Sequence, residues 1–257
     1  MKSQCKGESQ MQAIIMAAGK GSRLGNLTEG KPKSFAKIKG HRLIDYNISL
    51  LRYHGIDTII VTGYNYQEFE NEYESDQDIK LVFNPFYEEV NVQGSFWVGM
   101  RYITEEFLFI HADSLCDPDL FKELVESPGD IVLPVDFDTY NEEAMGVRLE
   151  DNYAVEISKD IPINKACGEF IGFAKFAGRV LNDIKEATED YLKEKKFKEY
   201  FESSIQTLMD KRSYDIVILP TAGRFWAEID FIEDYERAVS EIPNSLVDIA
   251  QKDKSPM

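Results

Sequence analysis

A short apolar run that leads directly into a glycine-rich segment constrains the fold of this chain most strongly. Residues 13–16 (AIIM) have the length and composition of a buried strand, and residues 17–24 (AAGKGSRL) follow at once. Glycines let a backbone approach an anion closely, so that its N–H groups can donate to it. Arg23 and Lys33 would add two positive charges around the same anion. The segment therefore predicts a polyphosphate-binding loop at the end of a strand.

Spacing excludes two other phosphate-binding loops. A dinucleotide fingerprint requires a third glycine where this chain has Leu24, and the next glycine, Gly25, comes one residue late. A Walker loop requires a lysine before the Ser or Thr, whereas Ser22 directly follows Gly21. A simple turn stays an alternative, because Gly-x-Gly alone is common in turns.

The apolar pattern predicts an α/β protein with a Rossmann-like three-layer α/β/α fold and a mixed, mostly parallel central sheet. A length of 257 residues suits one domain, which we place at 11–250. We expect 1–10 to be a disordered extension or tag and 251–257 to be a tail. The predicted strands are 12–18, 57–62, 79–83, 107–112, 130–135, 145–149, 153–158, 170–176 and 214–219. The predicted helices include 66–74, 94–104 and one that begins after Asp117, and a long helical region is predicted over about 178–210.

Composition limits the partners and the compartment. The formal net charge is -17, which argues against nucleic acid as a partner. The three cysteines form no close pair, so we expect a reducing, cytoplasmic location. No apolar run approaches the roughly 20 residues that span a bilayer, so we expect no membrane insertion. We expect a monomer or a homodimer.

Carboxylates at strand ends predict a magnesium site. Asp113 follows the apolar run 107–110, and Glu228 and Asp230 follow another apolar segment. Mg²⁺ favours one or two carboxylates together with phosphate oxygens and water. Asp113 as a simple cap is the alternative, and this reasoning leaves the choice between Glu228 and Asp230 open.

Polar residues near the same edge of the sheet are candidates for recognising a base and a second substrate. Asn91, Gln93 and Ser95 could contact a base, or they could merely cap a helix. An aromatic face such as Trp226 near Glu169 would attract an ammonium group. We expect the three histidines to be structural: His41, His54 and His111.

Motifs along nearly the whole chain recur in this order: GxGSRL with Pro32-Lys33, Gly63-Tyr64, Asn84 to Tyr87 with Asn91 and Ser95, Ala112-Asp113-Ser114, 168–172 (GEFIG) and 228–230 (EID). In these motifs the chain resembles the cytidylyltransferase branch of the nucleotidyltransferase superfamily. It is similar to bacterial CTP:phosphocholine cytidylyltransferases and to 2-aminoethylphosphonate cytidylyltransferases.

The resemblance implies Mg²⁺-dependent transfer of CMP from CTP to a small phosphate or phosphonate monoester, with release of pyrophosphate. It selects Asp230 as the second metal ligand beside Asp113, and it implies catalytic roles for Arg23 and Lys33. The expected nucleotide-binding residues are Ala18, Gly19, Gly21, Ser22, Arg23, Lys33, Asn91, Gln93, Ser95 and Asp113. The expected acceptor-binding residues are Lys159, Glu169 and Trp226. A sugar-1-phosphate nucleotidyltransferase and a non-catalytic nucleotide-binding regulatory module are the alternatives.

Overall fold

A computed structural model describes residues 11–28, 30–138, 140–141 and 143–253. The predicted extension over 1–10 therefore lies outside the described residues, as does the tail from 254 onward. Residues 251–253 of the predicted tail belong to a helix, α8 (Asn244–Asp253). This helix is held because Leu246 and Val247 pack into the core and Asp253 forms an ion pair with Arg52 at 2.8 Å.

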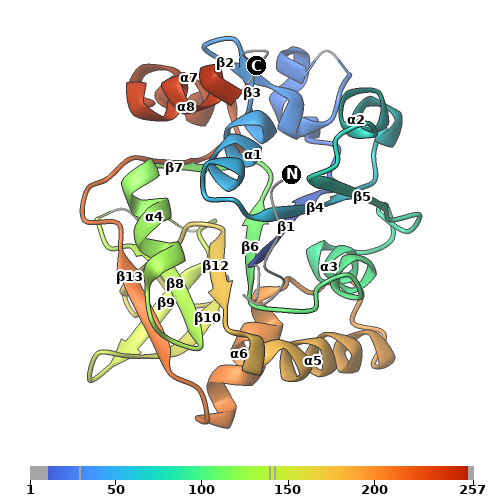
Figure 1. Cartoon of the computed structure of the whole chain (residues 1–257). Helices are drawn as coiled ribbons and strands as arrows, with labels where there is room; N and C mark the ends of the chain where they lie inside the picture. The colour runs from blue at the N-terminus through green and yellow to red at the C-terminus, as the bar shows by residue number, and fades with distance from the viewer. Residues whose placement is uncertain (1–10, 29, 139, 142, 254–257) are drawn as a thin grey trace, which may run out of the picture.

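Four parallel strands form the first half of the central sheet (Figure 1). Strand β1 (Gln12–Ala17) lies between β4 (Asp57–Thr62) and β6 (Phe107–His111), and β5 (Ile79–Phe83) pairs with β4. These are the strands that the apolar runs predicted. Because they are parallel, the residues that follow β1, β4 and β6 meet at one edge of the sheet.

The second half of the sheet is mainly antiparallel. The sheet order is β10-β9-β11-β8-β12-β6-β1-β4-β5, with β13 paired in parallel to β8. The bounds are β8 (Ile131–Asp136), β9 (Gly146–Glu150), β10 (Tyr153–Ser158), β11 (Gly168–Phe170), β12 (Phe173–Phe176) and β13 (Ile216–Pro220). The single strand predicted over 170–176 is wrong, because Gly172 has a φ of 81° and separates β11 from β12.

Helices cover both faces of the sheet and complete the predicted three layers (Figure 1). Their bounds are α1 (Leu43–Tyr53), α2 (Tyr66–Tyr73), α3 (Val92–Met100), α4 (Pro118–Glu126), α5 (Leu181–Lys193), α6 (Glu202–Lys211) and α7 (Ile232–Glu241). The helical region predicted over about 178–210 contains two helices, because residues 194–201 separate α5 from α6. Lys195 in that connection has a φ of 62°, a left-handed conformation that interrupts a helix.

Side chains of β1 point alternately to the two faces of the sheet, and each face packs against its own layer of the core. Ala13, Ile15 and Ala17 face the layer that contains residues of α1, α2, α4, α7 and α8. Ile14 and Met16 face the opposite layer, which contains residues of α3, α5 and α6. This complete burial explains why the strand reads as a continuous apolar run rather than an alternating one. Across the described ranges, no helix is long and apolar enough to cross a membrane.

A small separate sheet brings the end of the chain back to β6. Strand β14 (Trp226–Glu228) pairs in antiparallel fashion with β7 (Ser114–Cys116), so that Glu228 lies opposite Ser114. Just beyond this ladder, the backbone N–H of Ile229 donates to the carbonyl oxygen of Asp113 at 3.1 Å. The residues that follow β14 therefore lie beside the residues that follow β6.

Candidate active site

The glycine-rich loop packs directly against Lys33. Gly21 has a φ of 66°, a conformation that L side chains rarely adopt, and a Cβ atom there would overlap Cβ of Lys33. The loop continues as a 3₁₀ helix over Ser22–Thr28, and Lys33 begins a second one over Lys33–Phe35. The side chain of Ser22 lies outside what the structure describes. Glycine at position 21 is thus required both by backbone conformation and by the close approach of Lys33.

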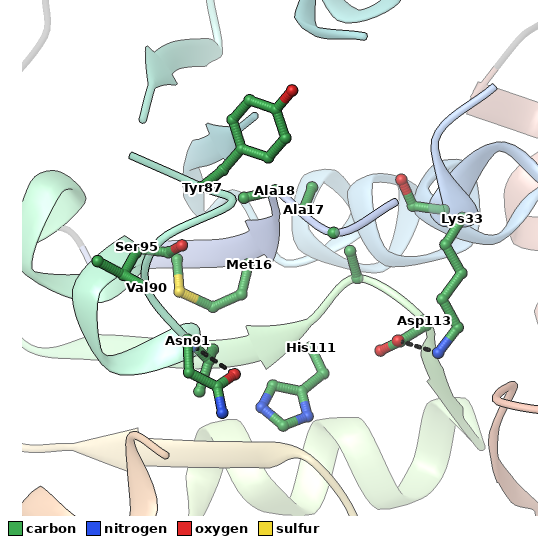
Figure 2. Close-up of a pocket in the computed structure, with 14 residues that line it drawn as sticks. Met16, Ala17, Ala18, Lys33, Tyr87, Val90, Asn91, Ser95, His111 and Asp113 are labelled. Atoms are coloured by element: carbon green, nitrogen blue, oxygen red, sulfur yellow. Dashed lines mark hydrogen bonds and ion pairs between the residues drawn. The ribbon is translucent and has the colours of Figure 1, made fainter. Parts of the chain in front are cut away.

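A cavity of about 310 Å³ opens between this loop, β6 and α3, and we call it the loop cavity (Figure 2). Its lining includes several of the predicted residues, namely Ala18, Gly19, Lys33, Asn91, Ser95 and Asp113. It also includes residues that we did not predict, among them Ser34 and His111. The carboxyl edge of the parallel strands therefore carries a cavity, as expected for an open α/β sheet.

Lys33 joins the two predicted metal ligands. Its Nζ lies 2.5 Å from Oδ2 of Asp113 and also contacts Oδ1 of Asp230 (Figure 2 draws the first pair). Burial lowers the pKa of the Lys33 ammonium group, but the charges of Asp113 and Asp230 outweigh it and raise that pKa. Burial raises the pKa of Asp113, whereas Lys33 and His111 lower it, and the net direction is downward. Lys33 and Asp113 are therefore both charged near neutral pH.

The convergence of Asp113 and Asp230 fits a magnesium ion. Both carboxylates reach the same ammonium group, although they come from the ends of β6 and β14. Their oxygens are the hard donors that Mg²⁺ prefers. Asp230 is further fixed because its backbone N–H donates to the Asp234 carboxylate at 3.0 Å, at the start of α7.

Arg23 lies on the Asp230 side of the site. Its guanidinium is 3.7 Å from both the Asp230 and the Glu143 carboxylates, and it sits over the ring of Phe231 at 5.1 Å. The side chain is 59% exposed, so it is free to reorient toward an incoming anion. Lys33 thus approaches Asp230 from the protein interior, and Arg23 approaches it from the solvent side.

The three residues predicted for base recognition have different placements. Ser95 lines the loop cavity, and its Oγ accepts a hydrogen bond from Nδ2 of Asn84. Asn91 also lines the cavity, and as the N-cap of α3 it accepts a hydrogen bond from the backbone N–H of Val92. Gln93 is a correction, because its side chain is fully buried and donates to Oγ of Ser204 at 2.6 Å. Gln93 is therefore not presented to the cavity.

Two of the predicted acceptor residues line a second cavity of about 450 Å³, which we call the acidic cavity. Its lining is Asn141, Glu143, Ala144, Glu169, Trp226, Glu228, Asp230, Phe231, Asp234 and Arg237. Burial, together with the charges of Glu228 and Asp136, raises the pKa of Glu169 to about 7. Asp136 lies opposite Glu169 in the β8–β11 ladder. The cavity therefore carries an excess of negative charge.

Lys159 belongs to a different cavity. It is exposed, sits over the ring of Tyr200 at 5.1 Å, and lines a cavity of about 570 Å³ between β10 and the α5–α6 connection. The structure does not bring it into the acidic cavity with Glu169 and Trp226. Its charge still lowers the pKa of Glu169, so the two cavities are electrostatically connected.

His111, which we expected to be structural, lies at the loop cavity between two carboxylates. Its Nδ1 lies 3.8 Å from Oε1 of Glu228, and its Nε2 lies 3.7 Å from Oε1 of Glu202. Burial lowers its pKa, but the nearby Glu228 and Glu202 carboxylates outweigh burial and raise the pKa to about 9. Sequence reasoning missed Glu202, which lies on α6 in the region predicted only as helical.

Ser34 is a second residue that sequence reasoning missed. Its side chain is buried at the loop cavity, and its Oγ has no hydrogen-bond partner among the described residues. A buried hydroxyl without a partner is costly, so such a group at a cavity is available to a ligand. Its position directly after Pro32-Lys33 was the available signal.

Comparison with known proteins defines the family. Residues 13–199 match the MobA-like NTP transferase domain, which covers most of the chain, and the chain belongs to this family. It is 28% identical over 250 residues to a CTP:phosphoglutamine cytidylyltransferase of Campylobacter jejuni, covering 88% of this chain and 98% of that protein. It is 27% identical over 243 residues to a choline-phosphate cytidylyltransferase of Streptococcus pneumoniae, covering 91% and 99% respectively.

A solved structure supports the fold. The inositol-1-phosphate CTP transferase from T. maritima superposes with a TM-score of 0.75 at 22% identity, covering 97% of this chain and 98% of that one. At this identity the likeness concerns the fold alone. The family and the fold together confirm the predicted Rossmann-like nucleotidyltransferase, and the protein is an enzyme of that class.

Proposed function

We propose that this enzyme transfers CMP from CTP to a small phosphate or phosphonate monoester and releases pyrophosphate, with Mg²⁺ as its cofactor. The observation that carries the proposal is the contact of one ammonium group, that of Lys33, with both Asp113 and Asp230 beside the glycine-rich loop. The cytidylyl donor is supported by relatives that span nearly the whole chain and are named as cytidylyltransferases.

The chain supplies charge and position rather than a general base. A phosphate monoester has a second pKa of roughly 6, so its oxygen is already ionised near neutral pH. That oxygen forms a bond to the α-phosphorus of CTP while the bond between this phosphorus and the bridging oxygen to the β-phosphorus breaks. The electron pair leaves with pyrophosphate, and no proton has to be removed from the acceptor.

Each residue has a place in this scheme. The loop from Ala18 to Gly21 holds the triphosphate through its backbone N–H groups, and Lys33 and Arg23 offset the charge that develops on it. Asp113 and Asp230 hold Mg²⁺, which supplies positive charge at the phosphates when bound. Asn91 and Ser95 lie where the nucleoside would enter the loop cavity.

The acidic cavity favours an acceptor with a cationic group. Glu169, Glu228 and Asp234 line it together with the face of Trp226, whereas Arg237 is its one positively charged described side chain. Carboxylates and an aromatic ring both attract an ammonium group. The same charges disfavour hexose 1-phosphates, which offer only hydroxyl groups beyond the phosphate.

A substrate screen tests the proposal. Pyrophosphate release is measured with CTP and with UTP, each against phosphocholine, phosphoethanolamine, 2-aminoethylphosphonate and hexose 1-phosphates. We expect turnover with CTP and an ammonium-bearing acceptor. Turnover with hexose 1-phosphates alone would show a sugar-activating enzyme instead, and nucleotide binding without turnover on any acceptor would favour a regulatory module.

A pair of variants tests the site. Asp113→Asn should lower turnover by on the order of 10³-fold, because it removes a charge at the transferred phosphate. Asp119→Asn is the matched control, since Asp119 is exposed on the first turn of α4. Equal turnover in the two variants would contradict the assignment of Asp113.

A further inference from the structure

Three side chains beside the Lys33 contacts form a second cluster with a different donor chemistry. One ligand atom each of His111, Asp113 and Glu228 lie within 4.8 Å of one another. His111 ends β6, Asp113 follows two residues later, and Glu228 ends β14. Figure 2 shows His111 and Asp113 side by side at the loop cavity. The β7–β14 ladder thus places Glu228 opposite the segment that carries the other two.

The donor set differs from that of the Asp113–Asp230 pair. Mg²⁺ prefers oxygen ligands, whereas an imidazole nitrogen together with carboxylates suits ions such as Co²⁺ and Zn²⁺. Bond lengths to these ions are about 2.0–2.2 Å, so two ligand atoms of one ion lie at most about 4.4 Å apart. Small side-chain rotations are enough to bring the three atoms from their present separation to that range.

Glu202 provides a second and independent observation. Its side chain is 1% exposed, and neither carboxylate oxygen has a hydrogen-bond partner among the described residues. Its Oε1 lies 3.7 Å from Nε2 of His111, which also lacks a hydrogen bond. A histidine that binds a metal almost always donates its other ring N–H to a carboxylate or another acceptor. Glu202 is placed to accept that hydrogen bond, while Nδ1 of His111 lies 3.8 Å from Oε1 of Glu228.

A purely structural role explains this arrangement less well. A buried structural ion pair is usually reinforced by hydrogen bonds, because a buried carboxylate that lacks them is costly. Here the nitrogen of His111 and the carboxylate of Glu202 face each other across an ion-pair distance without a hydrogen bond. A small rotation of the imidazole ring would bring Nε2 within hydrogen-bond distance of Glu202, and it would change the direction of Nδ1 at the same time.

We propose that His111, Asp113 and Glu228 form a site for a divalent transition-metal ion of the Co²⁺ and Zn²⁺ kind, with Glu202 as the positioning residue for His111. The site shares Asp113 with the Mg²⁺ pair and lies between the loop cavity and the acidic cavity. Its relevance to transfer rests on the proposed function, whereas ion binding itself is measured without turnover.

Cobalt binding to the whole protein tests the proposal. Co²⁺ is titrated into the metal-free enzyme and followed by visible absorption and by proton NMR. We expect a paramagnetically shifted, solvent-exchangeable signal from the Nε2–H of a metal-bound imidazole. Mg²⁺ at the same concentration should not displace the ion. Cobalt bound without such a signal, or displaced by equal Mg²⁺, would overturn the proposal.

Variants assign the ligands. His111→Asn should abolish the shifted signal and weaken Co²⁺ binding at least about tenfold, and Glu228→Gln should weaken it similarly. Glu202→Gln should keep the signal but weaken binding by roughly 10- to 100-fold and speed exchange of the shifted proton. His54→Ala is the matched control, because His54 is half-buried at the end of α1 and outside the cluster. A signal that persists in His111→Asn would also overturn the site.

Two further measurements keep the outcome clear. Circular dichroism and thermal unfolding establish that each variant is folded, and if His111→Asn does not fold, Glu228→Gln and the wild-type NMR spectrum decide. Pyrophosphate release with Mg²⁺ is measured in parallel on the wild-type enzyme. Turnover without the histidine signal refutes the cation site alone, whereas the signal without turnover refutes the proposed function alone.

Discussion

The Nζ atom of Lys33 lies 2.5 Å from Oδ2 of Asp113, and the same ammonium group also contacts Asp230. Lys33 follows the glycine-rich loop, whereas the two carboxylates follow strands of two different sheets. One cation therefore connects three segments of the chain. Without it, two carboxylates would face each other with no positive charge between them.

Lys33→Met should reduce both turnover and stability. We expect a loss of about 10²- to 10³-fold in kcat/KM for CTP, because a positive charge directed at the triphosphate is removed. The free energy of unfolding should also fall, since Asp113 loses the partner that lowers its pKa. Pyrophosphate release and thermal unfolding measure the two effects.

The acid dependence of stability provides a check on that variant. A carboxylate with a lowered pKa contributes stability above its ordinary pKa, and this contribution is lost as the pH falls through the lowered value. Lys33→Met should therefore flatten the loss of stability at acid pH. Lys31→Met is the control, because Lys31 is half-exposed and pairs with Glu68 at 3.1 Å. Identical acid profiles in Lys33→Met and the wild type would contradict the role of Lys33.

Gly21→Ala should destabilise the loop more than Gly19→Ala does. A Cβ at Gly21 would overlap Lys33 and would occupy a left-handed backbone conformation, whereas a Cβ at Gly19 meets nothing within 4 Å. We expect Gly21→Ala to lower the free energy of unfolding by about 1–3 kcal/mol. Gly19→Ala should leave stability unchanged and raise only the KM for CTP. Thermal melts of the two variants decide, and equal melting temperatures would count against the close packing of Gly21 on Lys33.

Ser34→Ala should weaken nucleotide binding without a loss of stability. Its Oγ has no partner among the described residues, so removal of the hydroxyl relieves a desolvation cost in the free enzyme. Loss of one hydrogen bond to the ligand should raise the Kd for CTP by about 3- to 10-fold. Ser49→Ala is the control, in which stability should fall while CTP binding stays unchanged. Buried Ser49 donates a hydrogen bond to Asp253 at 3.2 Å and lies away from the cavity. Calorimetry with CTP should show weaker binding only in Ser34→Ala.

Glu169 should make both stability and acceptor binding depend on pH. A carboxyl group whose pKa rises to about 7 on folding binds a proton that the unfolded chain has already released. Stability therefore falls as the pH rises from the ordinary glutamate pKa to about 7, by at most about 1.4 kcal/mol per pH unit. Urea unfolding at pH 5 and pH 8 should show this fall in the wild type and a reduced fall in Glu169→Gln.

The same titration should affect the acceptor in the opposite direction. Only ionised Glu169 attracts an ammonium group, so the KM for an ammonium-bearing acceptor should decrease as the pH rises through about 7. In Glu169→Gln the acceptor KM should be high and independent of pH over this range. Exposed Glu126→Gln is the control and should follow the wild type.

Short-range patterns were sufficient to predict the parallel half of the fold. Strands β1, β4, β5 and β6 are apolar runs of suitable length, and Asp117 and Pro118 mark the start of α4 as predicted. The errors occurred where one residue interrupts an otherwise regular pattern. Gly172 divides β11 from β12 and Lys195 lies between α5 and α6, and neither interruption changes the apolar periodicity around it.

The site could be predicted from the sequence only where its residues belong to a recognisable motif. Gly21, Lys33 and Asp113 stand in a recognisable spacing, and the structure brings Lys33 and Asp113 into contact. The surroundings of His111 depend on Glu202 and Glu228, which are distant in sequence and arrive through α6 and the β7–β14 ladder. Such contacts depend on tertiary packing, and the local pattern of residue types does not show them.

The change from parallel to antiparallel pairing between β6 and β12 separates the residues of the loop cavity from Glu169 along the chain. Residues up to Asp113 carry the loop cavity, and Glu169 enters from β11, beyond the antiparallel strand β12. The two parts meet at the β7–β14 ladder and at Lys33, which contacts both Asp113 and Asp230. Under the proposed function, a change of acceptor would therefore require residues of β11 and of the segment from β14 to α7, whereas the lining of the loop cavity would be left intact.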